Sequence, residues 1–304
     1  MEEKNVFRVS AKDVRRRLDL FLTDRLPSRI SRSRIQKLIK SGAILVNGSV
    51  RKSHYSVEGG DVIEVGSLPK EEISIRPEKI ALDIIHEDEK IIVINKPAGM
   101  VVHPAPGNYS RTVVNALLYH TKRLSDISKE RPGIIHRLDK DTSGVLVAAK
   151  DALAHAFIAR QFKKRTIDKR YLVFVEGTVQ LDNGEILAPI ARHARDRKRM
   201  AVNFTDGKEA ATLYRVVERY KTGTLLEIKI QTGRTHQIRV HLAYFGHPVV
   251  GDRTYGTKRT DSLIRRQALH SSKIVLLHPE TKERVSYEAE MPQDMKRLME
   301  KLKK

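Results

Sequence analysis

The spacing of apolar positions along the chain predicts helices in some segments and strands in others. Helical patterns cover residues 32–40, 112–120 and 151–163. Short apolar runs and alternating patterns predict strands at 44–46, 62–65, 91–94, 145–149, 169–176, 224–230, 273–277 and 285–289. Because these elements interleave without a regular β-α-β rhythm, we expect a mixed sheet of the α+β class rather than a doubly wound sheet.

The first elements form a small N-terminal unit, predicted over residues 15–66. A helical pattern begins at Arg17 and ends near Pro27. Ser31 is a candidate N-cap for the next helix, and Gly42 lies just past its end. These stop signals make the second helix of this unit short and well bounded.

An Asn47-Gly48 pair follows the first strand-like segment of this unit. Asn-Gly between β-prone segments is a strong hairpin signal, so we expect residues 44–46 to pair with a strand starting near Val50. Gly59-Gly60-Asp61 then leads into an alternating strand over residues 62–65.

The outer face of the second helix is basic and carries Arg32, Arg34 and Lys37. Such a face suits RNA phosphates, although many charge runs are only solvated surface. The segments SRSRIQKLIKSGAILVNG and EGGDVIEV resemble the alpha-L RNA-binding module of the small-subunit ribosomal protein four type. That resemblance implies that the three basic side chains contact RNA.

Two prolines and alternating charges predict a linker over residues 67–80. The second domain is then expected to cover residues 81–304. With 304 residues and 40% hydrophobic residues, the chain is long enough for two domains with their own cores.

The net charge of +21 comes from Lys and Arg spread along the whole chain. It predicts a polyanionic partner, most simply nucleic acid, although a generally basic soluble protein is the alternative. The absence of cysteine excludes disulfides, thiolate nucleophiles and cysteine-ligated metal sites. Without an apolar run of 18 residues or a signal-peptide core, we expect no membrane span and a cytoplasmic location. Nothing in the sequence demands more than a monomer.

The most informative stretch for chemistry is HRLDKDTSGVLVAAK, residues 136–150. Its apolar end predicts a buried strand, which would fix the preceding polar loop at the edge of a sheet. A carboxylate flanked by Arg137 and Lys140 would stay ionised there. Taken alone, an Asp in such a loop is more often part of a solvated turn that it caps, and the rest of the chain favours the catalytic interpretation.

This loop resembles the signature of the RluA/RluD branch of pseudouridine synthases. Three further segments resemble that family in the expected order: KPAGMVVHP at 96–104, KRYLVFVEG at 169–177 and GRTHQIRVH at 233–241. The stretches ARHARDRKRMAV, GKEAATLYRV, GHPVVGDRTYG, RQALH and PQDM look closest to the RluD type. The resemblance implies an isomerase without a cofactor that converts uridines of large-subunit ribosomal RNA, or of the pre-ribosomal particle, to pseudouridine.

The resemblance also implies roles for individual residues. Asp139 would be the catalytic carboxylate, and Arg234 would pair with it. Tyr171 would stack on the uracil, and Ile238 would pack on the opposite face of the base. Arg137 would fill the gap that a flipped base leaves in the RNA stack. Each residue also has an ordinary interpretation, for example Tyr171 as a strand residue or Arg234 as a phosphate ligand.

A second basic run, at residues 192–199, follows the end of a predicted strand. We expect an exposed loop in which Arg195, Arg197 and Arg199 contact RNA phosphates.

Metal and nucleotide cofactors are not expected. His136, His236 and His241 invite a metal interpretation, but the last two are five residues apart, which does not match a helical zinc motif. No G-x-G-x-x-G or G-x-x-x-x-G-K-[ST] pattern occurs. A non-catalytic ribosome assembly factor and a synthase acting on transfer RNA or another ribosomal site are the alternatives. A methyltransferase would need a glycine-rich cofactor loop that is not found.

Overall fold

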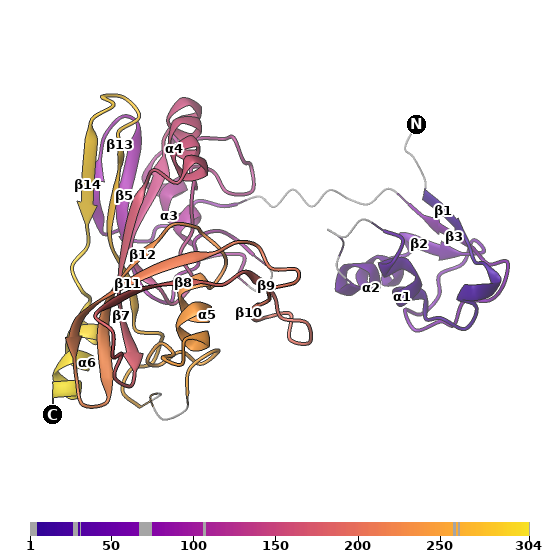
Figure 1. The fold of residues 1–304 in the computed structure, drawn as a ribbon. Coiled ribbons are helices and arrows are strands. Elements are labelled where there is room, and N and C mark those ends of the chain that lie inside the picture. Colours follow the sequence, from indigo (N-terminus) through magenta and orange to yellow (C-terminus); the bar gives the residue numbers. More distant parts are fainter. Residues whose placement is uncertain are drawn as a thin grey trace. The chain divides into compact units, whose positions relative to one another are not determined.

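The computed structural model describes residues 5–26, 30, 32–66, 75–105, 108–257, 260 and 262–303. The chain divides into two compact units, residues 1–73 and 74–304 (Figure 1). Residues 67–74 of the predicted linker and the candidate N-cap Ser31 lie outside the described residues.

The N-terminal unit combines two helices with a three-stranded antiparallel sheet in the order β1-β3-β2. Its elements are β1 (Asn5–Arg8), a 3-10 turn (Ala11–Asp13), α1 (Leu18–Thr23), α2 (Arg32–Lys40), β2 (Ile44–Val46) and β3 (Val62–Val65). The helix predicted at 32–40 is confirmed. Gly42 adopts a φ of 78°, and the next amide, of Ala43, returns to the carbonyl of Leu38, which ends α2 with a Schellman motif.

The predicted hairpin partner of β2 is wrong. Asn47 and Gly48 do form a tight turn with positive φ angles, closed by one bridge between Val46 and Ser49. No strand continues from it near Val50, and the strand partner of β2 is β3. Asn47 explains the choice: its side-chain oxygen accepts the amide of Val62 at 2.8 Å, and its own amide donates to the Val62 carbonyl. The turn residue therefore recruits β3 directly.

The second unit is built on a nine-stranded sheet in the order β4-β5-β6-β13-β7-β12-β11-β8, with β14 paired to β13 (Figure 1). Only β13 and β6 pair in parallel among the described strands, which confirms a mixed sheet of the α+β class. The strands are β4 (Ile84–Glu87), β5 (Ile91–Lys96), β6 (Ser143–Ala149), β7 (Asp168–Glu176), β8 (Asn183–Leu187), β11 (Ala211–Arg219), β12 (Gly223–Ile230), β13 (Leu269–Leu277) and β14 (Arg284–Glu288). A two-stranded ribbon, β9 (Ile190–Arg192) with β10 (Met200–Val202), stands beside it.

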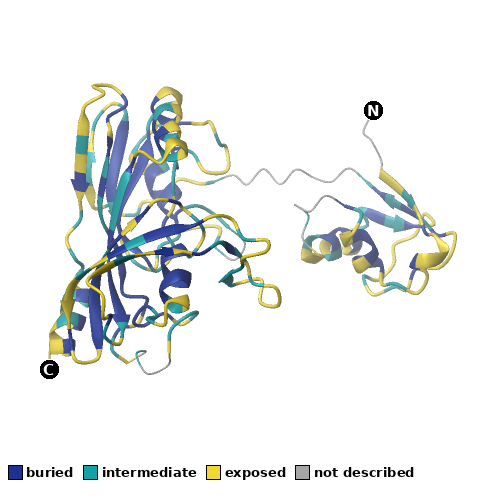
Figure 2. Ribbon diagram, viewed as in Figure 1, coloured by how far each residue is buried: buried dark blue, intermediate teal, exposed yellow. Residues whose placement is uncertain are grey.

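Four helices complete this unit: α3 (Val113–His120), α4 (Ala152–Lys164), α5 (Gln237–Tyr244) and α6 (Gln293–Lys303). Alternate residues of β5 point to opposite faces of the sheet and belong to two apolar clusters. Ile92 and Ile94 belong to the cluster that includes residues of α3 and α5. Ile91 and Val93 belong to the cluster that includes residues of α4. Both faces of the central strands are therefore buried, as Figure 2 shows in dark blue, and this explains their continuous apolar runs. No helix of the described residues is long and apolar enough to cross a membrane.

Gly144 makes the junction between β6 and β13 possible. It has a φ of 112°, and a Cβ atom there would lie 2.1 Å from the carbonyl oxygen of Ser271 on β13. This position both requires left-handed backbone and lacks space for a side chain.

Gly144→Ala is therefore expected to lower the free energy of unfolding by about 3 kcal/mol, combining backbone strain with a backbone clash. Gly246→Ala is the matched control, because Gly246 also has a positive φ but open space at its Cβ position. It should cost only about 1 kcal/mol. Urea unfolding of both variants measures the difference, and equal losses would contradict the clash.

Candidate active site

Two loops bring the candidate catalytic residues together. One precedes β6 and carries Asp139, and the other lies between β12 and α5. The Asp139 side chain is 19% exposed, and its Oδ2 accepts a hydrogen bond from Nη1 of Arg239 at 3.0 Å. The hydrogen bond and the ion pairs of the Asp139 carboxylate within the described residues all go to Oδ2, so Oδ1 has no such partner there.

The expected pairing of Asp139 with Arg234 is wrong. Arg234 lies in the loop before α5, where its Nε donates to the backbone carbonyl of Glu209 at 3.0 Å. Arg239 is one helical turn after His236 and projects from α5 toward Asp139. Which arginine contacts Asp139 is therefore decided by the direction in which each side chain leaves the helix or loop, and not by its position in the motif.

Arg239 is itself held by a buried carboxylate. Its Nε and Nη2 donate to the two oxygens of Asp252 at 2.6 and 2.8 Å, a bidentate pair. The backbone amides of Thr254 and Tyr255 also donate to Asp252. Burial opposes the charge on both partners. Their mutual contact nevertheless raises the pKa of Arg239 and lowers the pKa of Asp252. The guanidinium is thus a fixed, permanent cation beside Asp139.

A hydrogen-bond chain runs from the β9–β10 ribbon to His236, whose ring lies beside Asp139. The amide of Met200 donates to the hydroxyl of Tyr255 at 2.8 Å, and that hydroxyl lies 2.9 Å from Nδ1 of His236. Burial lowers the pKa of His236, which favours the neutral ring. In a neutral ring whose Nδ1 accepts the Tyr255 hydroxyl, Nε2 carries the proton. Nε2 lies 3.9 Å from Oδ2 of Asp139, which is longer than a hydrogen bond.

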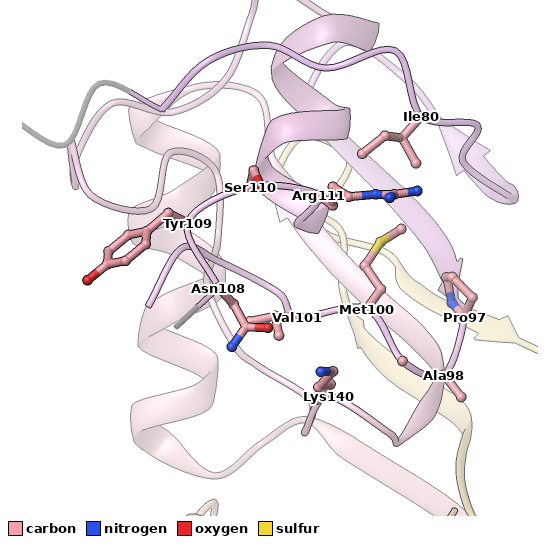
Figure 3. A pocket seen from close by; sticks show the side chains of 11 residues that line it. Ile80, Pro97, Ala98, Met100, Val101, Asn108, Tyr109, Ser110, Arg111 and Lys140 are labelled. Atoms are coloured by element: carbon pink, nitrogen blue, oxygen red, sulfur yellow. The ribbon is translucent and has the colours of Figure 1, made fainter. Parts of the chain in front are cut away.

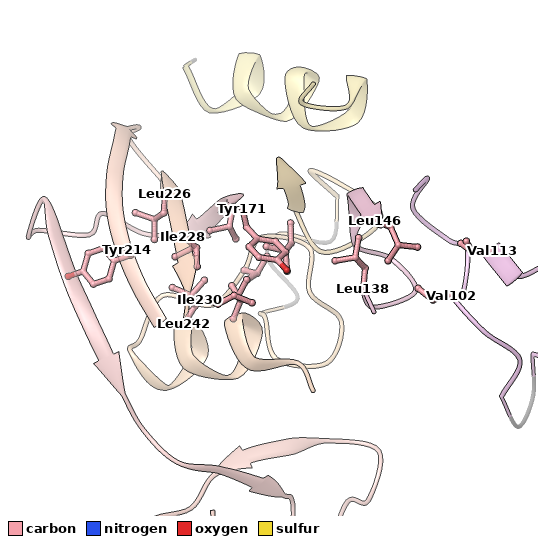
Figure 4. Close-up of a cluster of buried hydrophobic side chains, with 14 of the residues drawn as sticks. Val102, Val113, Leu138, Leu146, Tyr171, Tyr214, Leu226, Ile228, Ile230 and Leu242 are labelled. Atoms are coloured by element: carbon pink, nitrogen blue, oxygen red, sulfur yellow. The ribbon is translucent and has the colours of Figure 1, made fainter. Parts of the chain in front are cut away.

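The pocket over Asp139 has a volume of about 110 Å³. Four residues singled out in the sequence line it together with Asp139: Arg137, Tyr171, Arg234 and Ile238. Figure 4 shows Tyr171 beside Ile228 and Ile230 in the apolar layer. Burial raises the pKa of the Tyr171 phenol well above its usual range, so the ring is neutral and largely apolar.

The loop of Asp139 is anchored from below by Lys96. This side chain is fully buried, and its Nζ donates to the carbonyls of Pro97, Met100 and Lys140 at 2.8 to 3.0 Å. Burial lowers the pKa of Lys96 to about 7. A larger cavity, of about 610 Å³, is lined by the three residues whose carbonyls accept from Lys96 (Figure 3). Asp139 does not line it, but it lines both the 110 Å³ pocket and a cavity of about 560 Å³, which share Arg137, His236 and Arg239.

The predicted RNA-contacting residues of the N-terminal unit differ in their surroundings. Arg32 donates to the buried carboxylate of Asp19 at 2.9 Å, together with Arg17 and Gln36. Its charge is therefore partly compensated, whereas Lys37 is exposed. Arg34 is half-buried.

The basic run at 192–199 forms the turn of the β9–β10 ribbon. Arg195 and Arg197 are exposed, as expected. Arg199 is half-buried, with its guanidinium 5.3 Å from the ring centre of Tyr255. The ribbon thus presents two arginines to solvent and uses the third near the Asp139 site.

His136 and His241, the other two histidines considered as metal ligands, form hydrogen bonds within the fold. His241 is buried, with Nδ1 near Thr212 and Nε2 near the carbonyl of Ala188, and Nε2 of His136 accepts the amide of Val147. In the described part of the chain no three His, Asp or Glu side chains gather in a way that could hold a metal ion.

Four members of this site were not predicted as such from the sequence: Arg239, Asp252, Tyr255 and His236. Arg239 and His236 lie in GRTHQIRVH, and the other two lie in GDRTYG, so both segments belong to motifs that resemble the family. The signal that could have found Arg239 is a charged residue between Ile238 and Val240 on a largely apolar helix, because such a residue needs a buried partner.

A carboxylate held by a buried arginine lines a pocket with a neutral tyrosine, on a chain of net charge +21, and this arrangement suits an enzyme that acts on nucleic acid. The RNA pseudouridylate synthase family model matches residues 90–244, and the S4 domain model matches residues 16–63. The chain belongs to the pseudouridine synthases of the RluA/RluD type, which are isomerases, and its N-terminal S4 domain is an RNA-binding domain.

Individual relatives agree with this assignment. The chain is 44% identical over 289 residues to the uncharacterized RNA pseudouridine synthase YlyB of Bacillus subtilis, covering 95% of this chain and 94% of the relative. It is 43% identical over 300 residues to ribosomal large subunit pseudouridine synthase D of Xylella fastidiosa, covering 95% and 89%. The solved structure of human RNA pseudouridylate synthase domain containing 1 superimposes with a TM-score of 0.58 at 25% identity, covering 74% of this chain and 96% of that chain.

Proposed function

We propose that this enzyme isomerises specific uridines of large-subunit ribosomal RNA, with Asp139 as the catalytic carboxylate acting on a flipped-out base. The observation that carries the proposal is the Asp139 carboxylate, held through Oδ2 by Arg239, in a pocket that Tyr171 also lines. The substrate class is supported by relatives named ribosomal large subunit pseudouridine synthase D.

The reaction breaks the N1–C1′ bond, turns the uracil and joins C5 to C1′, while the C5 proton is lost and N1 gains one. Oδ1 of Asp139 can attack C1′ or take the C2′ proton. A base inside a stem must leave its stack to reach this carboxylate, at a cost of a few kcal/mol. Tyr171 and Ile238 then pack against the base, and the exposed Arg137 fills the vacated stack, since a guanidinium stacks well on bases. Arg234 is assigned to RNA phosphate.

The direct test is carbodiimide-adduct primer extension on a large-subunit ribosomal RNA transcript incubated with the protein. New stops locate the modified uridines and establish the substrate. Stops on transfer RNA alone would support a different substrate of the same chemistry. Modification of a pre-ribosomal particle but not of the transcript would make the particle the substrate. RNA binding without any stop on these substrates would favour the assembly-factor alternative. The cytoplasmic location and the monomeric state stay predictions from the sequence.

Replacing Arg195 and Arg197 by Gln is expected to weaken RNA binding without changing the rate at saturating RNA. Removal of one phosphate contact should reduce the slope of log K against log salt by roughly 0.7 to 0.9. The matched control is Lys221→Gln with Lys303→Gln, which removes two charges near α6. Filter binding across a salt series measures both slopes, and an unchanged slope would remove the ribbon from the RNA footprint. Adding Arg199→Gln should weaken RNA binding further. It should also lower the rate at saturating RNA, because Arg199 packs on Tyr255.

Tyr255→Phe is expected to lower the rate at saturating RNA about fivefold, which corresponds to one hydrogen bond of about 1 kcal/mol. The substitution frees His236 to rotate or change tautomer beside Asp139, while RNA affinity stays unchanged. Tyr220→Phe is the control, because its hydroxyl bonds only Glu218 among the described residues. Single-turnover kinetics separate the two effects, and an equal slowing by both variants would exclude a positioning role for Tyr255.

A further inference from the structure

A second cavity, of about 520 Å³, adjoins the Asp139 pocket and is lined by cations. We name it the Lys169 cavity. Its basic lining residues are Arg131, Arg137, Lys163, Arg165, Lys169 and Arg234. No Asp or Glu of the described residues lines it. Because Arg137, Tyr171 and Arg234 line both cavities, a ligand that fills one can continue into the other.

Lys169 is the residue in this cavity that most needs a partner. Its side chain is half-buried, and no ion pair of its ammonium occurs among the described residues. The ring of Phe162 lies 5.3 Å from its Nζ. Burial lowers the pKa of Lys169 to about 8, so it is charged at neutral pH at a cost. Nδ1 of His103, on the same lining, is buried without a hydrogen-bond partner in the described part of the chain.

The other buried cations around the site have partners within the chain. Arg239 pairs with Asp252, and Arg266 pairs with Asp294. Lys96 has no carboxylate partner among the described residues, but its ammonium donates to three backbone carbonyls. Arg165 pairs with Glu209 at the rim of the Lys169 cavity, but both side chains are exposed and the pair is screened. Lys169 is therefore the half-buried cation of this cavity whose charged group has neither an ion pair nor a hydrogen bond among the described residues.

The strand geometry links Lys169 to the base-binding face. Lys169 and Tyr171 are two residues apart on β7, so they project from the same face about 7 Å apart. A nucleotide whose base lies on Tyr171 stays covalently attached to its neighbouring phosphates. One of these phosphates would supply the missing anion.

We propose that the Lys169 cavity binds a backbone phosphate of the RNA strand next to the uridine in the Asp139 pocket. The inference rests on the proposed function and deepens it, because it fixes the side from which the strand leaves the site. Lys169 supplies the point charge, and the orphaned His103 nitrogen supplies a donor in its Nδ1–H tautomer.

The first experiment compares Lys169→Gln with the wild type in single-turnover reactions on a stem-loop RNA carrying a uridine located by primer extension. The half-saturating RNA concentration should rise about tenfold at physiological salt, and the salt slope should fall by about one. The rate at saturation should stay within about threefold. Lys169→Arg should retain most of the affinity, and Lys221→Gln, far from the cavity, should change neither quantity. Unchanged affinity and slope in Lys169→Gln would overturn the proposal.

A second experiment identifies the ligand as a phosphate of that strand. Single methylphosphonate linkages, which are uncharged, are placed at each phosphate within two nucleotides of the uridine. At one position the wild type should lose about tenfold in affinity, while Lys169→Gln loses nothing more. Independent losses at every position would overturn the proposal. A third result would also overturn the proposal: inorganic phosphate inhibits the wild type but not Lys169→Gln, and no single linkage depends on Lys169. The cavity would then bind a free anion and not a phosphate of the RNA strand.

The outcome is separable from that of the proposed function. If the wild type forms no pseudouridine in any RNA, the proposed function fails. The RNA affinities of the same variants are then compared by filter binding, on fragments of the large-subunit transcript with and without the uncharged linkages. Lys169→Gln should have a melting temperature equal to or above that of the wild type without RNA, since it removes an uncompensated half-buried charge. A lower melting temperature would show that the charge is already compensated within the chain and would overturn the proposal.

Discussion

Asp139→Asn is expected to reduce pseudouridine formation by at least about 10³-fold, because the amide can neither attack C1′ nor accept the C2′ proton. The fold should persist. Arg239 keeps its bidentate pair with Asp252, and Asn has nearly the same shape as Asp. RNA affinity should be equal or higher, since a negative charge near the phosphates is removed. Single-turnover carbodiimide mapping with parallel filter binding measures both quantities.

Asp141→Asn is the matched control for this prediction. Asp141 lies in the same loop, and its substitution removes the same charge, yet Arg239 and His236 contact Asp139 alone of the two. The rate of this variant should stay within about threefold of the wild type. Comparable losses in the two variants would mean that the loop charge as a whole matters, and a wild-type rate in Asp139→Asn would exclude this carboxylate from the chemistry.

Arg239→Gln is expected to cost about 3 to 5 kcal/mol of unfolding free energy, because it leaves Asp252 buried without a cation. The rate at saturating RNA should fall about 10²-fold or more as Asp139 loses its orientation. Arg234→Gln, in contrast, should cost about 1 kcal/mol or less and act mainly on RNA affinity. Urea unfolding and single-turnover rates separate the two arginines.

A double variant divides stability from catalysis at this site. Arg239→Met combined with Asp252→Asn removes both buried charges, so part of the lost stability should return, as buried ion pairs replaced together often show. The rate should stay low, because Asp139 still lacks its guanidinium. A fully active double variant would show that Arg239 serves only to stabilise the fold, and an Arg234→Gln variant as slow as Arg239→Gln would restore the pairing first expected from the sequence.

The elements that could be predicted are those set by short-range patterns. The helices near 32–40, 112–120 and 151–163 and six strands of the second unit, β5, β6, β7, β12, β13 and β14, follow from local spacing and stop signals. The strands β4, β8 and β11 and the helices α5 and α6 were not predicted. The apolar run after Gly144 predicted both the buried strand and the loop before it, and so the place of Asp139. The reaction class was predicted from the resemblance of four motifs, in the expected order, to the pseudouridine synthases.

Pairing of β2 was mispredicted because an Asn-Gly turn specifies a reversal but not a partner. The local turn closes with one bridge, Val46 to Ser49, while the side chain of Asn47 accepts the amide of Val62, fifteen residues away, beside the β2–β3 pairing. The arginine at Asp139 was mispredicted for a similar reason. Arg234 and Arg239 lie in the same motif, and only the start of α5 at Gln237 sets which side chain faces the carboxylate.

By itself, therefore, the sequence determined the α+β class, the RNA-binding character and Asp139 as the candidate carboxylate, since these depend on composition, periodicity and short motifs. Only the tertiary structure decided the Asp139–Arg239–Asp252 chain, the Tyr255–His236 contact with the ribbon and the uncompensated charge of Lys169. Each of these joins groups from distant segments, and their energies depend on distance and burial, which a linear pattern does not contain.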